Sequence, residues 1–202
     1  AGSAVLFLSE RRDDGVSVSS RLMISVFQAV SASTTDGFNS VDIGALAPAS
    51  ITIIMILMFV GASPGGTGGG IKTTTLGVLA RFAWRSITNG DEHIDMWGRE
   101  FPAGTVRKAC SVLLWFIAIA VADMLVLSAV EDVPYLPLLF EAVSALGNTG
   151  LSMGATSSLG AMAKLLLSIT MFIGRVGPLT LGLSLLENRR PPLYRFPEED
   201  VF

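Results

Sequence analysis

The chain has 202 residues, of which 50% are hydrophobic and 15% charged, and its mean hydropathy is +0.60. Soluble domains carry about 25% charged residues, and the apolar residues here are gathered in long runs, so this composition places the chain in a lipid bilayer. A net charge of −3 gives no indication of a nucleic-acid partner, and the single cysteine, Cys110, excludes a disulfide framework and a cysteine-rich metal site.

Four apolar segments follow one another along the chain. The opening residues, Ala1–Leu8, lack the basic region of a signal peptide and are interpreted as the end of a membrane helix. Ala45–Ala62, Val106–Val130 and Leu159–Leu186 are each long enough to cross about 30 Å of hydrocarbon as a helix. We therefore expect an all-α membrane protein with three long spans.

Two shorter apolar stretches, Leu22–Ala32 and Pro137–Leu146, precede the first and third of these spans. At about ten residues each they are too short to cross a bilayer, and they fit re-entrant helices. Arginine and lysine gather between residues 81 and 108 and in the C-terminal tail. The positive-inside rule puts both of these segments in the cytoplasm, so the re-entrant helices are expected to enter from outside.

An internal repeat relates the two halves of the chain. Phe27–Ala32 matches Phe140–Ala145 with one substitution at a constant offset in numbering (140 − 27 = 113), and the same offset aligns Gly37 with Gly150. Each repeat then has a membrane helix, a pore helix, a glycine loop and a second membrane helix. The two repeats are residues 1–105, with a truncated opening helix, and residues 106–202, with a C-terminal tail.

Each repeat carries a glycine-bearing loop directly after its short helix. A dehydrated potassium ion needs oxygen ligands all round, and backbone carbonyls pointing to one axis supply them. Glycine permits the necessary backbone torsions, and the short helices would direct their negative ends to the same place. Because the repeat makes the two loops equivalent, a shared pore is favoured over ordinary extracellular turns. The candidate filter residues are Thr34, Thr35, Asp36, Gly37 and Phe38 in the first loop and Gly147, Asn148, Thr149, Gly150 and Leu151 in the second.

The segments Phe27–Asp42 and Phe140–Ser152 resemble the third and fourth pore units of the Trk/Ktr/HKT superfamily of potassium transporters. Members of that superfamily resemble four fused membrane–pore–membrane units around a single pore, each with one filter glycine. The resemblance implies potassium uptake across the inner (plasma) membrane, with K⁺ as the transported ion and Na⁺ as a candidate coupling ion. It also implies a homodimer of membrane subunits, a cytoplasmic nucleotide-binding regulatory ring of RCK type, and two further repeats of the same pore.

A glycine-rich stretch, residues 61–75, follows the first long span. A phosphate-binding loop is disfavoured there because Ile71 separates the last glycine from Lys72, and because an apolar span rather than a strand precedes it. Close helix packing through Gly61 and Gly65 explains part of the stretch, but so many glycines break a helix. By the resemblance this stretch is an intramembrane gating loop, with candidate gate residues Gly65, Gly66, Thr67, Gly68, Gly69, Gly70, Lys72 and Arg175.

Two charged residues fall inside the long spans. Arg175 lies near the middle of the third span, where a charge costs at least about 2.5–3.5 kcal/mol on insertion scales, so it needs protein or water around it. The sequence leaves open whether Arg175 binds carbonyls of the gating loop, repels cations or reaches an interface. Asp123, in the second span, is expected to pair with Arg175 or Lys72, or to lie in a polar pocket, in preference to coordinating an ion.

Passive or ion-coupled potassium translocation is the leading hypothesis. The rival from another class is a membrane enzyme or nucleotide-binding protein built on Gly65–Thr73, but we expect no enzyme because the chain has no nucleophile–base pair or metal-ligand set for one. Within the superfamily, a sodium- or proton-coupled cation transporter is an alternative, and a non-conducting scaffold with packing glycines is another. The sequence does not separate Ktr-like from Trk-like members.

Overall fold

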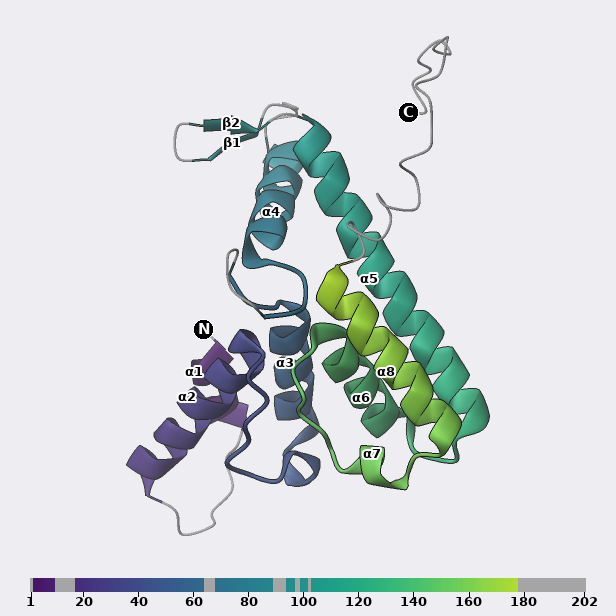
Figure 1. The fold of residues 1–202 in the computed structure, drawn as a ribbon. Helices are drawn as coiled ribbons and strands as arrows, with labels where there is room; N and C mark the ends of the chain where they lie inside the picture. The colour runs from purple at the N-terminus through teal and green to yellow at the C-terminus, as the bar shows by residue number, and fades with distance from the viewer. Residues whose placement is uncertain are drawn as a thin grey trace.

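The structure, a computed structural model, describes residues 2–9, 17–63, 68–88, 94–96, 99–101 and 103–177. Helices make up most of this part of the chain, and they are arranged around α6 (Figure 1). In chain order the elements are α1 (Gly2–Ser9), α2 (Val18–Thr34), the 3₁₀ turn η1 (Ile43–Ala45), α3 (Pro48–Phe59), α4 (Thr73–Thr88), β1 (Ile94–Met96), β2 (Arg99–Phe101), α5 (Ala103–Val130), α6 (Tyr135–Gly147), α7 (Ala155–Ser158) and α8 (Ala161–Val176).

Among the described helices, α5 alone is long and apolar enough to cross a membrane. Where the structure describes them, the expectation that Ala45–Ala62 and Leu159–Leu186 each form one long helix was wrong, and residues 178–186 lie outside the described residues. Helix α3 has 12 residues, or about 18 Å at 1.5 Å per residue, and it ends where the glycine-rich stretch begins. Helix α8 ends at Val176, because Gly177 takes a φ of 84° and a proline follows it.

The two short helices predicted from the sequence lie within α2 and α6. Helix α2 starts after Ser17, whose hydroxyl accepts a hydrogen bond from the backbone N–H of Ser20 at 3.3 Å, and α6 starts after Pro134. Both helices begin at the lower end of the molecule and end near mid-height, where the chain turns back toward η1 or α7 (Figure 1).

A short β-ribbon departs from the all-α expectation. Strands β1 and β2 pair antiparallel between α4 and α5, with Ile94 opposite Phe101 and Met96 opposite Arg99. The ribbon lies at the upper end of the molecule, away from the turns at η1 and α7 (Figure 1). Each strand is too short for the alternating pattern by which strands are recognised in a sequence.

The core places α6 between the two halves of the molecule. On one side Phe140 and Val143 of α6 join a buried cluster with α3, which contributes Ile51, Ile54 and Met58. On its other side α6 packs against α5 and α8 in a second cluster, with Met124, Leu127, Leu138, Ala163 and Leu167 among its buried residues. Helix α6 is thus covered by protein on both sides, whereas the main helix contacts of α2 in the described part of the chain are with α1 and α3.

Candidate ion pathway

Helices α2 and α6 end in the same way. Thr35 directly after α2 has a φ of 61°, and Asn148 directly after α6 has a φ of 53°. These are the two non-glycine residues with positive φ in the described part of the chain, and they are equivalent by the offset of the repeat (148 − 35 = 113). A left-handed residue at this position closes the last turn of a helix and turns the chain back.

The same backbone hydrogen bond follows each helix end. The N–H of Asp36 donates to the carbonyl of Ser31 at 3.2 Å, and the N–H of Thr149 donates to the carbonyl of Ser144 at 3.0 Å. The two donors, Asp36 and Thr149, and the two acceptors, Ser31 and Ser144, are each related by the 113-residue offset of the repeat. The equivalence noticed in the sequence therefore extends to the geometry of the turns.

The two glycine loops lie against one another. Gly37 has a φ of 76° and Gly150 a φ of 86°, a conformation that side chains disfavour. A Cβ atom on Gly37 would overlap the carbonyl oxygen of Thr149, and a Cβ on Gly150 would lie 4.0 Å from the Cα of Gly37. The residues that follow differ, because Phe38 is 69% exposed whereas Leu151 is buried.

The surroundings of the loops favour a cation. The C-terminal ends of α2 and α6 both point to the loops, and each carries the partial negative charge of a helix C-terminus. Asp36 adds a carboxylate, whose Oδ2 accepts a hydrogen bond from the Thr34 hydroxyl at 2.8 Å. No group of three or more His, Cys, Asp or Glu side chains that could hold a metal ion occurs among the described residues.

The glycine-rich segment crosses the ends of both short helices. A Cβ on Gly68 would lie 2.7 Å from the Thr35 hydroxyl oxygen and 3.2 Å from the Thr34 carbonyl oxygen. A Cβ on the next residue, Gly69, would overlap the carbonyl oxygen of Gly147. Consecutive glycines thus touch the last residues of α2 and α6, and larger side chains would not fit there.

Two hydrogen bonds hold this segment against α3 and α4. Lys72, which directly precedes α4, donates from Nζ to the carbonyl oxygen of Gly68 at 2.5 Å. The N–H of Ile71 donates to the carbonyl of Phe59, the last residue of α3, at 3.1 Å. Three candidate gate residues, namely Gly65, Gly66 and Thr67, lie outside the described residues.

Helix α8 contacts the second loop through its backbone. The side-chain amide of Asn148 donates from Nδ2 to the carbonyl oxygen of Met171 at 2.8 Å. A Cβ on Gly174 would overlap the carbonyl oxygen of Leu146, so glycine lets α8 approach the end of α6. No local sequence pattern predicts the Asn148–Met171 bond. Asparagine is common directly after a helix because it tolerates the left-handed conformation, so its presence there does not indicate a side-chain hydrogen bond.

Arg175 follows Gly174 in the last turn of α8. It is exposed, and the helix ends one residue later, so the expectation that Arg175 lies in the middle of a long helix was wrong. A basic side chain in the last turn interacts favourably with the negative end of its own helix.

Glu141 is a buried carboxylate behind the second loop. Its Oε1 accepts hydrogen bonds from the Ser152 hydroxyl at 2.5 Å and the Met153 N–H at 3.2 Å, and its Oε2 accepts one from the Thr156 hydroxyl at 2.5 Å. The carboxylate thus ties α6 to the chain just after Gly150. Its counterpart in the first repeat, Gln28, is buried, and its amide atoms have no hydrogen-bond partner among the described residues.

Asp123 of α5 binds Thr170 of α8. The Thr170 hydroxyl donates to Oδ2 of Asp123 at 2.7 Å, and both side chains are buried. Neither Arg175 nor Lys72, the cations considered from the sequence, is the partner in this bond. A helix-to-helix hydrogen bond satisfies one oxygen of a carboxylate that α5 would otherwise expose to lipid.

A model of a family of cation transport proteins, TrkH, matches residues 14–187. The chain belongs to the TrkH family. Three relatives extend this match, and the chain covers less than half of each. Ktr system potassium uptake protein D of Bacillus subtilis (strain 168) is 36% identical over 182 residues, which are 89% of this chain and 40% of that protein. Potassium/sodium uptake protein NtpJ of Enterococcus hirae is 33% identical over 99% of this chain and 46% of that protein. Ktr system potassium uptake protein B of Vibrio alginolyticus is 32% identical over 99% of this chain and 44% of that protein.

A solved structure of the family shares the fold. The crystal structure of the potassium transporter TrkH from Vibrio parahaemolyticus superposes with a TM-score of 0.78 at 23% identity, covering 92% of this chain and 41% of that one. The family match and the relatives confirm the resemblance noted in the sequence at the level of the superfamily, and the solved structure shows that the fold is shared. Membership of the TrkH family implies a membrane protein.

Proposed function

We propose that this TrkH-family chain forms part of a potassium-uptake pathway across the plasma membrane, lined by the loops of Gly37 and Gly150. The observation that carries the proposal is the contact between these two loops at the ends of two identically capped helices. Successive carbonyls held by positive-φ glycines, with two helix C-termini behind them, suit a dehydrated monovalent cation. The printed names of the relatives, potassium uptake and potassium/sodium uptake proteins, support the same ion class.

Two loops make half of a ring of ligands. We assign residues 1–105 and 106–202 to the third and fourth of four membrane–pore–membrane units, so that the complete filter needs two further glycine loops. The candidate filter residues of this half are Thr34, Thr35, Asp36, Gly37, Phe38, Gly147, Asn148, Thr149, Gly150 and Leu151.

The glycine-rich segment then acts as a gate. Gly68 and Gly69 lie against the last residues of both pore helices, where ions leaving the loops would pass on this proposal. The hydrogen bond from Lys72 to Gly68 holds the segment in this blocking position. Arg175 lies one residue beyond the contact of Gly174 with Leu146 and adds a positive charge to the same exit.

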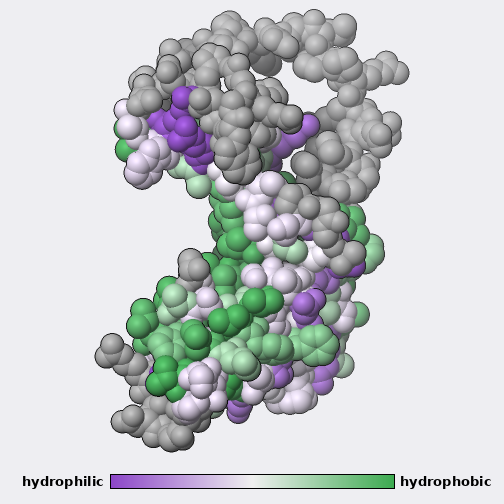
Figure 2. Space-filling model, turned by 90° about the vertical axis from the view of Figure 1, so that its left-hand side faces the viewer, coloured by the Kyte–Doolittle hydropathy of each residue, from purple (hydrophilic) through white to green (hydrophobic). Residues whose placement is uncertain are grey.

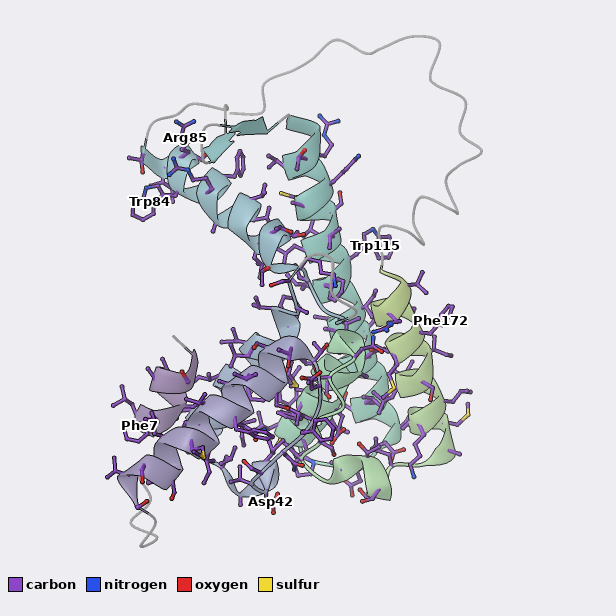
Figure 3. The ribbon with its side chains drawn as sticks, turned by 60° about the vertical axis from the view of Figure 1, so that its left-hand side comes forward. Phe7, Asp42, Trp84, Arg85, Trp115 and Phe172 are labelled. Atoms are coloured by element: carbon purple, nitrogen blue, oxygen red, sulfur yellow. The ribbon has the colours of Figure 1, made fainter. Side chains whose placement is uncertain are left out.

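The distribution of charge supports the orientation, and the partners are those that the family resemblance implies. Trp84 and Arg85 at the end of α4 lie at the end of the molecule opposite Asp42 (Figure 3). The basic end, with the β1–β2 ribbon, faces the cytoplasm, where an RCK-type ring would dock on a homodimer of the complete membrane subunit.

Sodium or proton coupling is the second candidate mechanism, favoured by the potassium/sodium name of one relative. A non-conducting scaffold is the third.

Rubidium uptake by bacteria that lack their own potassium uptake tests the proposal. Expression of the complete protein should restore uptake that rubidium dominates over sodium, and Gly37→Ser or Gly150→Ser should abolish this selectivity. Gly77→Ala is the matched control, because Gly77 lies inside α4 with nothing within 4 Å of its Cβ position. Normal selectivity in both loop variants, at normal protein levels, would contradict the filter assignment.

A further inference from the structure

A hollow of about 300 Å³ lies between α4 and α5. Its wall combines polar side chains with apolar ones, among them Thr74, Thr75, Thr105 and Lys108 on the polar side and Val78 and Val112 on the apolar side. Ligand pockets range from about 300 to 1,000 Å³, so this hollow has room for the polar part of a small ligand. Among the described residues that line it none is acidic, and Lys108 adds a positive charge, so the hollow favours an anion.

Lys108 lies at the depth of lipid head groups. It precedes Val130, the last residue of α5, by 22 residues (130 − 108 = 22), which correspond to about 33 Å of helix. The hydrocarbon core of a bilayer is about 30 Å thick, so Lys108 reaches one boundary of this core when Val130 is at the other. Asp123, the one charged residue between them in the sequence, is buried and bonded to Thr170.

The end of the molecule that carries α4 has the features of a membrane surface. Trp84 and Arg85 lie there (Figure 3), and the Trp84 side chain is 65% exposed. Figure 2 shows hydrophilic residues gathered at the upper end of the molecule and a broad hydrophobic area in its lower half. Tryptophan is enriched where lipid meets water, and arginine is enriched on the cytoplasmic side. In the orientation proposed above, the hollow therefore lies at the head groups of the inner leaflet.

An apolar surface leads from the hollow toward the middle of the bilayer. Trp115 follows Lys108 by seven residues, or about two helical turns, so both side chains lie on the same side of α5. Trp115 is 58% exposed and projects outward from α5 (Figure 3). A phosphate bound at Lys108 would therefore place the acyl chains of its lipid beside Trp115. A soluble phosphate compound would leave this apolar surface uncovered.

We propose that the hollow binds the phosphate of an anionic phospholipid such as phosphatidylglycerol. Lys108 supplies the positive charge, and the hydroxyls of Thr74, Thr75 and Thr105 supply hydrogen-bond donors to the phosphate oxygens. Basic pockets between membrane helices on the cytoplasmic side bind lipid head groups by the same chemistry. The site is separate from the ion pathway, and only its assignment to the inner leaflet rests on the proposed function.

Native mass spectrometry of the complete protein in a non-ionic detergent tests this site. Titration with phosphatidylglycerol and, separately, with phosphatidylcholine gives the Kd of each lipid. Phosphatidylglycerol should bind about fivefold more tightly, because the choline ammonium of the second lipid opposes the attraction of its phosphate to Lys108.

Three variants separate a built site from the general attraction of anionic lipid to a basic surface. Lys108→Met should raise the Kd of phosphatidylglycerol about fivefold, the effect of one lysine at an anionic surface, and Lys108→Arg should restore it. Thr105→Val removes one hydrogen-bond donor with little change of shape and should raise the Kd about threefold. Lys164→Met is the matched control, because Lys164 is exposed on α8 and is not among the residues that line the hollow.

Fluorescence quenching locates the bound lipid. Phosphatidylglycerol with brominated acyl chains should quench the emission of Trp115, measured as the difference between the complete protein and its Trp115→Phe variant. Lys108→Met should need about five times more lipid for the same quenching.

Four results would each contradict this site. Equal Kd values for the two lipids, or equal losses from Lys108→Met and Lys164→Met, would show attraction without a binding site. An unquenched Trp115 would place the lipid elsewhere on the protein. Displacement of phosphatidylglycerol by inorganic phosphate would assign the hollow to a soluble phosphate compound. None of these measurements depends on ion uptake, so a failure here leaves the filter assignment untouched.

Discussion

The Cβ position of Gly150 lies 4.0 Å from the Cα of Gly37, whereas a Cβ on Gly37 would overlap the backbone of the second loop. The two glycines are equivalent in sequence but not in their room for a side chain. Gly37→Ala should therefore impair selectivity for rubidium over sodium more than Gly150→Ala does. Gly150→Ala carries only the strain of positive φ, about 1 kcal/mol, while Gly37→Ala adds overpacking of about 1–3 kcal/mol. Equal selectivity loss, measured by competitive uptake, would argue against this contact.

Asn148 supplies both a left-handed turn and a side-chain anchor to α8. Asn148→Gly keeps the turn and removes the anchor, so the free energy of unfolding should fall by about 1 kcal/mol. Asn148→Ala loses both the turn and the anchor, so its free energy of unfolding should be lower by about a further 1 kcal/mol. Chemical or thermal unfolding of the purified complete protein measures the series. An alanine variant as stable as the glycine variant would show that the turn itself adds nothing.

Glu141 should be a stability determinant of the second loop, because its carboxylate accepts three hydrogen bonds from the segment after Gly150. Glu141→Leu leaves those donors without acceptors and should lower the free energy of unfolding by at least about 2 kcal/mol. Glu141→Gln keeps one acceptor oxygen, so its free energy of unfolding should lie between those of the unmodified protein and Glu141→Leu. Gln28→Leu is the matched control, since that amide has no partner among the described residues. A larger loss in the control than in Glu141→Leu would contradict this interpretation.

Lys72 should restrain the glycine-rich segment in its blocking position through its bond to Gly68. Lys72→Met removes the donor, so rubidium flux should rise several-fold in the absence of any activating partner. Lys164→Met on the exposed surface of α8 is the control for loss of a lysine. Lower flux from Lys72→Met, at unchanged protein levels, would mean that the lysine assists ion passage instead of restraining the segment.

The sequence predicted the helices around the two loops better than it predicted the long spans. The repeat located α2, α6 and both glycines because equivalent residues recur at one offset. Hydropathy overestimated the lengths of α3 and α8, because the apolar run continues past the glycine at which each helix ends. Length alone therefore could not tell one crossing helix from a helix interrupted inside the membrane.

Patterns of hydropathy and repeats in the sequence could not predict contacts between segments that are distant in sequence. The bonds from Asn148 to Met171 and from Thr170 to Asp123 depend on how α8 packs, which no local pattern specifies. The Glu141 contacts had a partial signal, because Ser152 and Thr156 follow the second loop as hydroxyl donors. Only the recurrence at one constant offset made two distant loops comparable before the fold was known.

Ion density between the loops is the most direct test of the central assignment. Crystals of the complete protein grown in rubidium should show anomalous density on an axis beside Gly37 and Gly150, within coordination distance of backbone carbonyls of both loops. Ordered loops with no rubidium between them, or rubidium bound only elsewhere, would contradict the account.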